Sequence, residues 1–147
     1  TTRKPCRLPT NRVAVKKGLV QTDKEFVMST FDNAVSIHPY FKIQEGQMEA
    51  CKSFLTQFCE KVANEEMCLY YNFTFKGDVL CCREAYHDAD GVQAHLDNCG
   101  PLLGEFLKIA DLTRIEVHGP AEELEKLKPA FADFDPDYYI CACGIGR

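Results

Sequence analysis

The 147-residue chain contains no run of 18 consecutive apolar residues, so no segment is long enough to cross a membrane as a helix. It carries no excess of positive charge: the net charge is −5 at pH 7, which argues against the whole chain binding nucleic acid. Neither a P-loop nor a dinucleotide fingerprint is present, and the Gly-Ile-Gly run at 144–146 opens no helix. The sequence therefore favours neither a membrane partner, nor a nucleic-acid partner, nor a nucleotide cofactor.

What is present is ordinary globular composition, with 46% hydrophobic and 27% charged residues in a length typical of one domain. The charge is unevenly spread. Residues 1–35 hold seven Lys/Arg against three acidic residues, whereas residues 36–147 hold ten against nineteen. We predict a basic N-terminal arm over 1–35 and a folded domain over 36–147. A solvated extension is the favoured interpretation of the arm, and the alternatives are a remnant of organelle targeting or a segment lying on the acidic body.

Cysteine is abundant, and its count of nine is odd. A secreted disulfide framework usually has an even count in a smaller chain, so we expect free thiols in a reducing, intracellular compartment. No pair has the C-x₂-C spacing of a zinc knuckle. Adjacent cysteines on a strand point to opposite faces, so the sequence predicts no metal site at Cys81 and Cys82 and assigns no role to Cys141 and Cys143.

Hydrophobic periodicity and turn residues divide the domain into short elements. The clearest helix carries Met48, Cys51, Leu55 and Phe58 at helical spacing. A Gly-centred turn at 76–78 predicts a hairpin. The predicted elements are strand 37–43, helix 44–64, strands 67–75 and 79–86, helices 88–98 and 101–108, strand 112–118, helix 120–128 and strand 138–143.

Two prolines qualify this assignment. Pro39 should place the first strand at a sheet edge or at a bulge, because proline has no N–H to donate to a neighbouring strand. Gly100-Pro101 should break the second helical region in two, with Pro101 opening the second piece and Asp88 capping the first.

The order β-α-β-β-α-β is the ferredoxin-like pattern, here followed by an extra C-terminal helix and strand. It predicts an α+β domain with an antiparallel sheet that buries one face under helices. Strand 67–75 carries aromatic or apolar residues at both odd and even positions. One domain of this size cannot cover both faces, so we predict that a second subunit covers the other face in a homodimer.

The segment 83–96, REAYHDADGVQAHL, resembles the antibiotic biosynthesis monooxygenase (ABM) family. Glu84, Tyr86 and His95 match an acid, an aromatic residue two positions later, and a histidine eleven positions after the acid. The resemblance implies a dimeric α+β barrel with a pocket between sheet and helices in each subunit. Characterised members oxidise phenolic or quinol-type aromatics with molecular oxygen and no bound cofactor. The axial histidine of the haem-degrading branch has no counterpart in 101–108, and the chain has no Trp, so any pocket role of Trp is unfilled or passes to Tyr86.

Within this resemblance His95 is the candidate base, and Glu84 orients it or serves as the base itself. Tyr86 and Asn72 would hold a developing oxyanion through O–H and N–H donors. Three tyrosines would stack on a flat aromatic substrate: Tyr40, Tyr70 and Tyr71. The structural alternative is that His95 only ties helix to strand through Glu84, with the tyrosines in the core.

The leading hypothesis is therefore a cofactor-independent monooxygenase that acts on a small hydroxylated aromatic or quinol. A non-catalytic dimeric module that binds a small hydrophobic molecule would use the same pocket. So would an isomerase or cyclase of polyketide-like compounds, because the same base could move protons without oxygen.

Overall fold

The computed structural model describes residues 32–144. All but the last four residues of the predicted arm lie outside this range, and Val35 already belongs to the first strand. No helix of the described part is long and apolar enough to cross a membrane. The elements are β1 (Val35–Ile43), α1 (Met48–Val62), β2 (Cys68–Lys76), β3 (Val79–Tyr86), α2 (Ala89–Phe106), β4 (Ala110–Gly119), α3 (Ala121–Leu127) and β5 (Asp137–Ile140).

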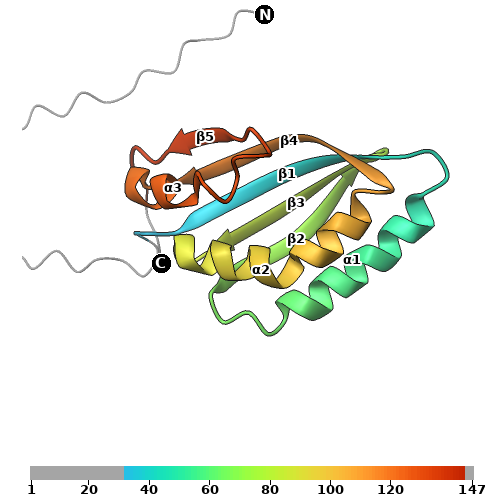
Figure 1. Cartoon of the computed structure of the whole chain (residues 1–147), viewed down its shortest axis with the longest axis horizontal. Coiled ribbons are helices and arrows are strands. Elements are labelled where there is room, and N and C mark those ends of the chain that lie inside the picture. The colour runs from blue at the N-terminus through green and yellow to red at the C-terminus, as the bar shows by residue number, and fades with distance from the viewer. Residues whose placement is uncertain (1–31, 145–147) are drawn as a thin grey trace, which may run out of the picture.

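The five strands form one sheet in the order β2-β3-β1-β4-β5 (Figure 1). The first four pair antiparallel, which confirms the ferredoxin-like arrangement. β5 pairs parallel to the last four residues of β4, 116–119, because α3 and the turn after it carry the chain back along β4 before β5 begins. The predicted extra helix and strand therefore turn a four-stranded antiparallel sheet into a five-stranded mixed one.

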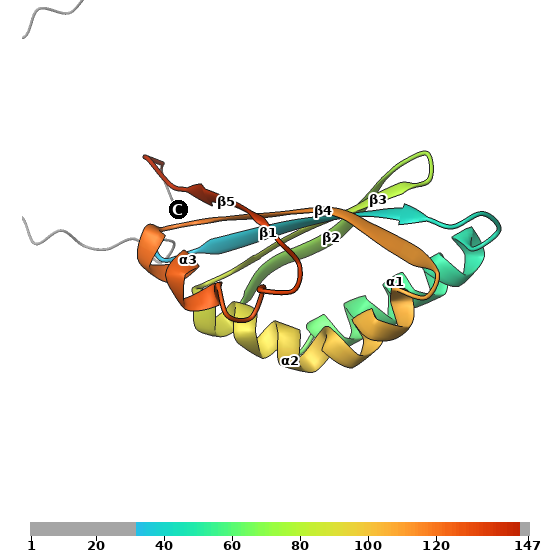
Figure 2. The same ribbon diagram turned by 45° about the horizontal axis from the view of Figure 1, so that its top comes forward.

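Both long helices cover the same face of the sheet (Figure 2). α1 buries Cys51, Phe58 and Val62 against it, as the helical spacing predicts. The centre of this layer is Phe106 of α2, whose ring lies 5.2 Å from that of Phe41 and 5.9 Å from that of Phe58. Burial of each of these rings contributes about 1.5–3 kcal/mol of hydrophobic stabilisation.

The predicted break in α2 is wrong. A single helix runs from Ala89 to Phe106 with Pro101 inside it, and Figure 2 shows it bending along its length. Proline removes one backbone hydrogen bond, but the residues on either side pack on the sheet, and this packing outweighs the local preference. The predicted N-cap is confirmed: the Asp88 carboxylate accepts from the Gly91 N–H at 2.9 Å.

β1 is a central strand between β3 and β4, so the edge position predicted from Pro39 is wrong. Pairing with β3 covers 35–37 and 40–42 and is interrupted at Pro39. On the β4 side the register shifts between Tyr40 and Phe41, immediately after the proline. The missing N–H is thus accommodated by an irregular ladder, which is the bulge alternative.

In the part of the chain that the structure describes, no helix covers the other face of the sheet (Figure 2). We call it the outer face. Its side chains are a mixture of aromatic and charged groups. Tyr70 of β2 and Tyr139 of β5 are 42% and 44% exposed. Tyr139 stacks on His118 at 4.5 Å and accepts from the Arg114 guanidinium at 3.1 Å. Within residues 32–144, nothing packs over these exposed aromatic side chains as α1 and α2 do on the opposite face.

Candidate functional site

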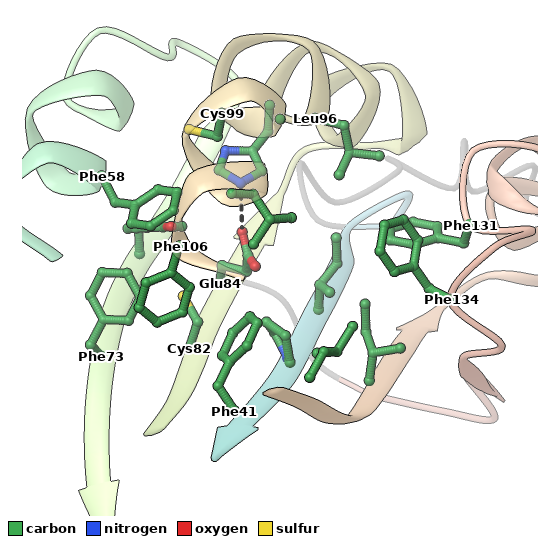
Figure 3. Close-up of a pocket in the computed structure, with 18 residues that line it drawn as sticks. Phe41, Phe58, Phe73, Cys82, Glu84, Leu96, Cys99, Phe106, Phe131 and Phe134 are labelled. Carbon is green, nitrogen blue, oxygen red and sulfur yellow. Dashed lines mark ion pairs between the residues drawn. The ribbon is translucent and has the colours of Figure 1, made fainter. Parts of the chain in front are cut away.

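A cavity of about 70 Å³ lies between the helix-covered face of the sheet and α2 (Figure 3). Most of its wall is aromatic or aliphatic, including Phe41, Phe58, Phe73 and Phe106. Two side chains of the wall carry the groups that can exchange protons with a ligand, the carboxyl of Glu84 and the imidazole of His95. An apolar cavity with a small number of converging polar groups is the usual form of a small-molecule site.

Strand and helix periodicity place these two groups together. Alternation along β3 points Leu80, Cys82 and Glu84 toward the helices. His95 lies on the buried side of α2 together with Cys99, one turn further on. His95 Nε2 lies 3.3 Å from Glu84 Oε2, the contact that is dashed in Figure 3. Both residues are buried, with 7% and 5% of their surface exposed.

Tyr86 holds Glu84 from the side away from the cavity. Its hydroxyl donates to Glu84 Oε2, and its ring lies 5.1 Å from that of His95. It is completely buried in the core and is not part of the cavity wall. Tyr86 is therefore placed to position Glu84 rather than to touch a substrate in the cavity.

The residue that completes the site is Glu65, in the connection between α1 and β2. One of its carboxylate oxygens lies 3.0 Å from His95 Nδ1, and the other accepts from Asn98 Nδ2 at 2.7 Å. Cys99 Sγ donates to the same carboxylate at 3.9 Å. Sequence reasoning missed Glu65 because an acid in a connection has no periodic signal, and no motif links it to a histidine 30 residues away.

The contacts of His95 decide which ring nitrogen carries the hydrogen when the imidazole is neutral. A carboxylate can only accept, so Nδ1 carries the hydrogen toward Glu65 and Nε2 presents its lone pair toward Glu84. Burial raises the pKa of Glu84, against the opposing influence of His95 and of the Tyr86 hydroxyl. Burial and Glu65 raise the pKa of the Cys99 thiol to about 12. The site therefore places a carboxyl group, whose neutral form is favoured by burial, 3.3 Å from an imidazole nitrogen.

The structure brings only part of the predicted substrate-binding set to this cavity. Tyr71 lines it, with its ring 5.5 Å from that of His95. Tyr40, Tyr70 and Asn72 do not line it and belong to the outer face. The reason is the two-residue period of a strand, which turns the neighbours of Tyr71 to the opposite side. A substrate-binding role for these three residues stays a prediction.

The cysteines behave in two ways. Cys82 lines the cavity, whereas Cys81 lies on the outer face beside Tyr40, so the two point apart as expected. The eight cysteines between residues 32 and 144 carry free thiols. Within that range, one group of side chains has donor atoms close enough together to share a metal ion: Glu65, His95 and Cys99. The hydrogen bonds described above already satisfy these three side chains without an ion.

The chain was compared with known proteins. No protein-family model and no curated protein matches it. Among solved structures it is similar to MupZ from Pseudomonas fluorescens, with 40% sequence identity over 78% of this chain and 95% of MupZ and a TM-score of 0.75.

More distant structures share the fold. A Caulobacter crescentus protein assigned to the antibiotic biosynthesis monooxygenases has 21% identity over 59% of this chain and 89% of its own, with a TM-score of 0.54. Rv0793 from Mycobacterium tuberculosis has 18% identity over 60% and 95%, also with a TM-score of 0.54.

Proposed function

Because the chain belongs to the antibiotic biosynthesis monooxygenase family, we propose that it is a cofactor-independent monooxygenase of a small hydroxylated aromatic or quinol. One observation carries this proposal: His95 and the buried Glu84 meet at 3.3 Å in the wall of an otherwise apolar cavity. Such a pair can remove a proton from a substrate and return one, and the apolar wall keeps water away from the reactive anion.

In the proposed reaction, His95 Nε2 takes the proton that activates a CH₂ group conjugated with a phenol. Glu65 stabilises the imidazolium that forms, through Nδ1–H at 3.0 Å. The resulting carbanion is oxidised by molecular oxygen, and a carbon–oxygen bond forms. Loss of the second oxygen as water, with the two hydrogens of the CH₂ group, leaves a carbonyl. The electrons come from the substrate, so no external reductant is needed.

Glu84 is the proton donor in the same proposed reaction. Its carboxyl proton passes to the departing oxygen, and His95 returns the proton taken from the substrate across the 3.3 Å contact. Tyr86 keeps donating to Glu84 throughout and so holds the carboxyl in place. Burial raises the pKa of Glu84, which favours the protonated form that this step requires.

A second candidate is an isomerase or cyclase of polyketide-like compounds. The observation that favours it is that the site holds both a proton acceptor and a proton donor. Side by side, the two can move a proton within a substrate, and this transfer does not require oxygen. The two reactions differ in their products, since isomerisation conserves mass and proceeds without oxygen.

Oxygen uptake by metal-stripped protein over a panel of quinols and anthrone-type phenols tests the proposal. We expect uptake above autoxidation in the native protein, and its loss in His95→Ala and Glu84→Gln. Conversion under anaerobic conditions to a product of unchanged mass would support the second candidate instead. Binding without conversion under either condition would refute both and leave a non-catalytic binding module.

We also propose a homodimer that covers the outer face. The support is the exposure of Tyr70 and Tyr139, together with the absence of any helix over this side of the sheet in the described residues. A partner on this face would bury aromatic area that water now contacts. The free thiols between residues 32 and 144 are consistent with the proposed location in a reducing, intracellular compartment.

A further inference from the structure

The cavity is too small for the proposed substrate in the conformation seen. A volume of about 70 Å³ is roughly half of the 150 Å³ that accommodates benzene in an engineered protein cavity. An aromatic substrate therefore has to displace part of the wall. Substrate atoms that do not fit in the cavity will extend through the part of its wall that is displaced most easily.

That part of the wall comes from the C-terminal extension. Phe131 and Phe134, in the turn between α3 and β5, close one end of the cavity (Figure 3). Phe131 is fully buried, whereas Phe134 is 37% exposed and packs edge-on against it at 6.5 Å. Phe134 therefore has the cavity on one side and solvent on the other. Rotation of its ring would open the cavity without disturbing the core.

A surface groove begins where Phe134 lies. It runs along α2, and four residues line both the groove and the cavity: Leu96, Gly100, Leu103 and Phe134. Along this side α2 is bare at Gly100 and Gly104, where an added Cβ would meet nothing within 4 Å. The groove is thus continuous with the cavity and separated from it only by side chains.

The lining of the groove indicates what it binds. Among the described residues that line it, the one charged side chain is Lys126, which pairs with Glu123 at 2.7 Å. The remainder is aliphatic, aromatic or glycine apart from Gln93. A second depression that Phe134 also borders carries Arg114, Asp135 and Asp137 and is unsuited to an apolar group. The groove along α2 is therefore the path for an uncharged, aliphatic part of a ligand.

We propose that the substrate is elongated, with its reactive ring beside Glu84 and His95 and an aliphatic chain that passes Phe134 into the groove along α2. This inference rests on the proposed function for the ring and adds the chain. It makes the C-terminal extension a determinant of substrate length, through Phe134.

Calorimetric titration of the full chain with 4-alkylphenols, from methyl to nonyl and below their aggregation concentrations, tests this proposal. Each added methylene should tighten binding roughly fourfold until the groove is filled, the factor expected for burial of one CH₂. In Gly104→Leu the new side chain occupies the groove, and affinity should become independent of chain length. Glu105→Leu adds the same side chain at the next position, outside the groove, and should retain the dependence on chain length.

A wild-type affinity that does not rise with chain length, or a rise that survives in Gly104→Leu, would overturn the proposal. Phe134→Ala should speed association of the nonyl compound, and an unchanged rate would exclude Phe134 as the entry point. The two proposals fail separately. Turnover of short phenols without chain dependence refutes the elongated substrate alone, whereas chain-dependent binding without turnover refutes the monooxygenase alone.

Discussion

Replacing Glu65 by alanine tests whether the arrangement around His95 is a working proton relay. The Glu65 carboxylate accepts from His95 Nδ1 at 3.0 Å and from Asn98 Nδ2 at 2.7 Å. Hydrogen bonds to charged groups contribute about 1.5–3 kcal/mol each. The side chain is 12% exposed, so water can replace part of what is lost, and the lower end of that range applies to both bonds.

The free energy of unfolding should therefore fall by about 3 kcal/mol, which lowers the melting temperature by roughly 10 °C in a domain of this size. A second effect concerns the imidazole. Without an acceptor at Nδ1, the hydrogen of neutral His95 moves to Nε2, where it can bond to Glu84. Nε2 then has no lone pair for the substrate, and turnover should fall at least about 100-fold, the lower range of general acid–base catalysis.

Nitrogen-15 NMR of protein labelled at histidine reports the tautomer directly and needs no substrate. Wild-type His95 should carry its hydrogen on Nδ1, and Glu65→Ala should carry it on Nε2. Glu65→Gln is the matched control, because its amide oxygen still accepts from Nδ1 and should preserve the wild-type tautomer with a smaller loss of stability. An Nδ1–H tautomer that persists in Glu65→Ala, with a stability loss below about 1 kcal/mol, would refute the relay.

Three further predictions concern the pH dependence of stability, two glycines of α2 and the proposed dimer. Burial raises the pKa of Glu84 above its ordinary value of 4.5, so its contribution to stability is complete below that value and is lost as the pH rises through the raised pKa. The free energy of unfolding of Glu84→Gln, measured with urea from pH 4 to 9, should therefore decline less toward high pH than that of the wild type, and parallel curves would contradict this. Gly104→Ala should raise the free energy of unfolding by up to about 1 kcal/mol, since alanine favours helix and its Cβ meets nothing within 4 Å. Gly91→Ala should lower the free energy of unfolding by about 1–3 kcal/mol, because the added Cβ would lie 2.9 Å from the Met67 Cβ. If Gly91→Ala and Gly104→Ala changed the free energy of unfolding equally, this close contact would relax at no cost. Sedimentation at micromolar concentration should show a dimer. Tyr70→Asp should dissociate this dimer, whereas the control Glu49→Lys, on the exposed side of α1, should leave it intact. A monomeric wild type would refute the outer-face interface.

Local patterns anticipated much of the fold. The helical spacing of Cys51 and Phe58 and the turn centred on Gly77 predicted α1 and the β2–β3 hairpin, and both are present. The two prolines were misjudged because a missing N–H is a local cost, whereas the packing that offsets it is not local. Pro101 lies within a helix whose flanking residues are buried, and Pro39 lies in a strand held on both sides.

By itself, the sequence determined the element types, because the periods of strand and helix are properties of neighbouring residues. The family resemblance of segment 83–96 singled out Glu84, Tyr86 and His95. Only the tertiary structure decided that Glu65 meets His95, that Tyr40, Tyr70 and Asn72 face away from the cavity, and that Phe134 closes it. Each of these depends on how distant segments pack and on which face of a strand the core selects. A shift of one residue in strand register would reverse that choice, and burial of the complete apolar face is what excludes it.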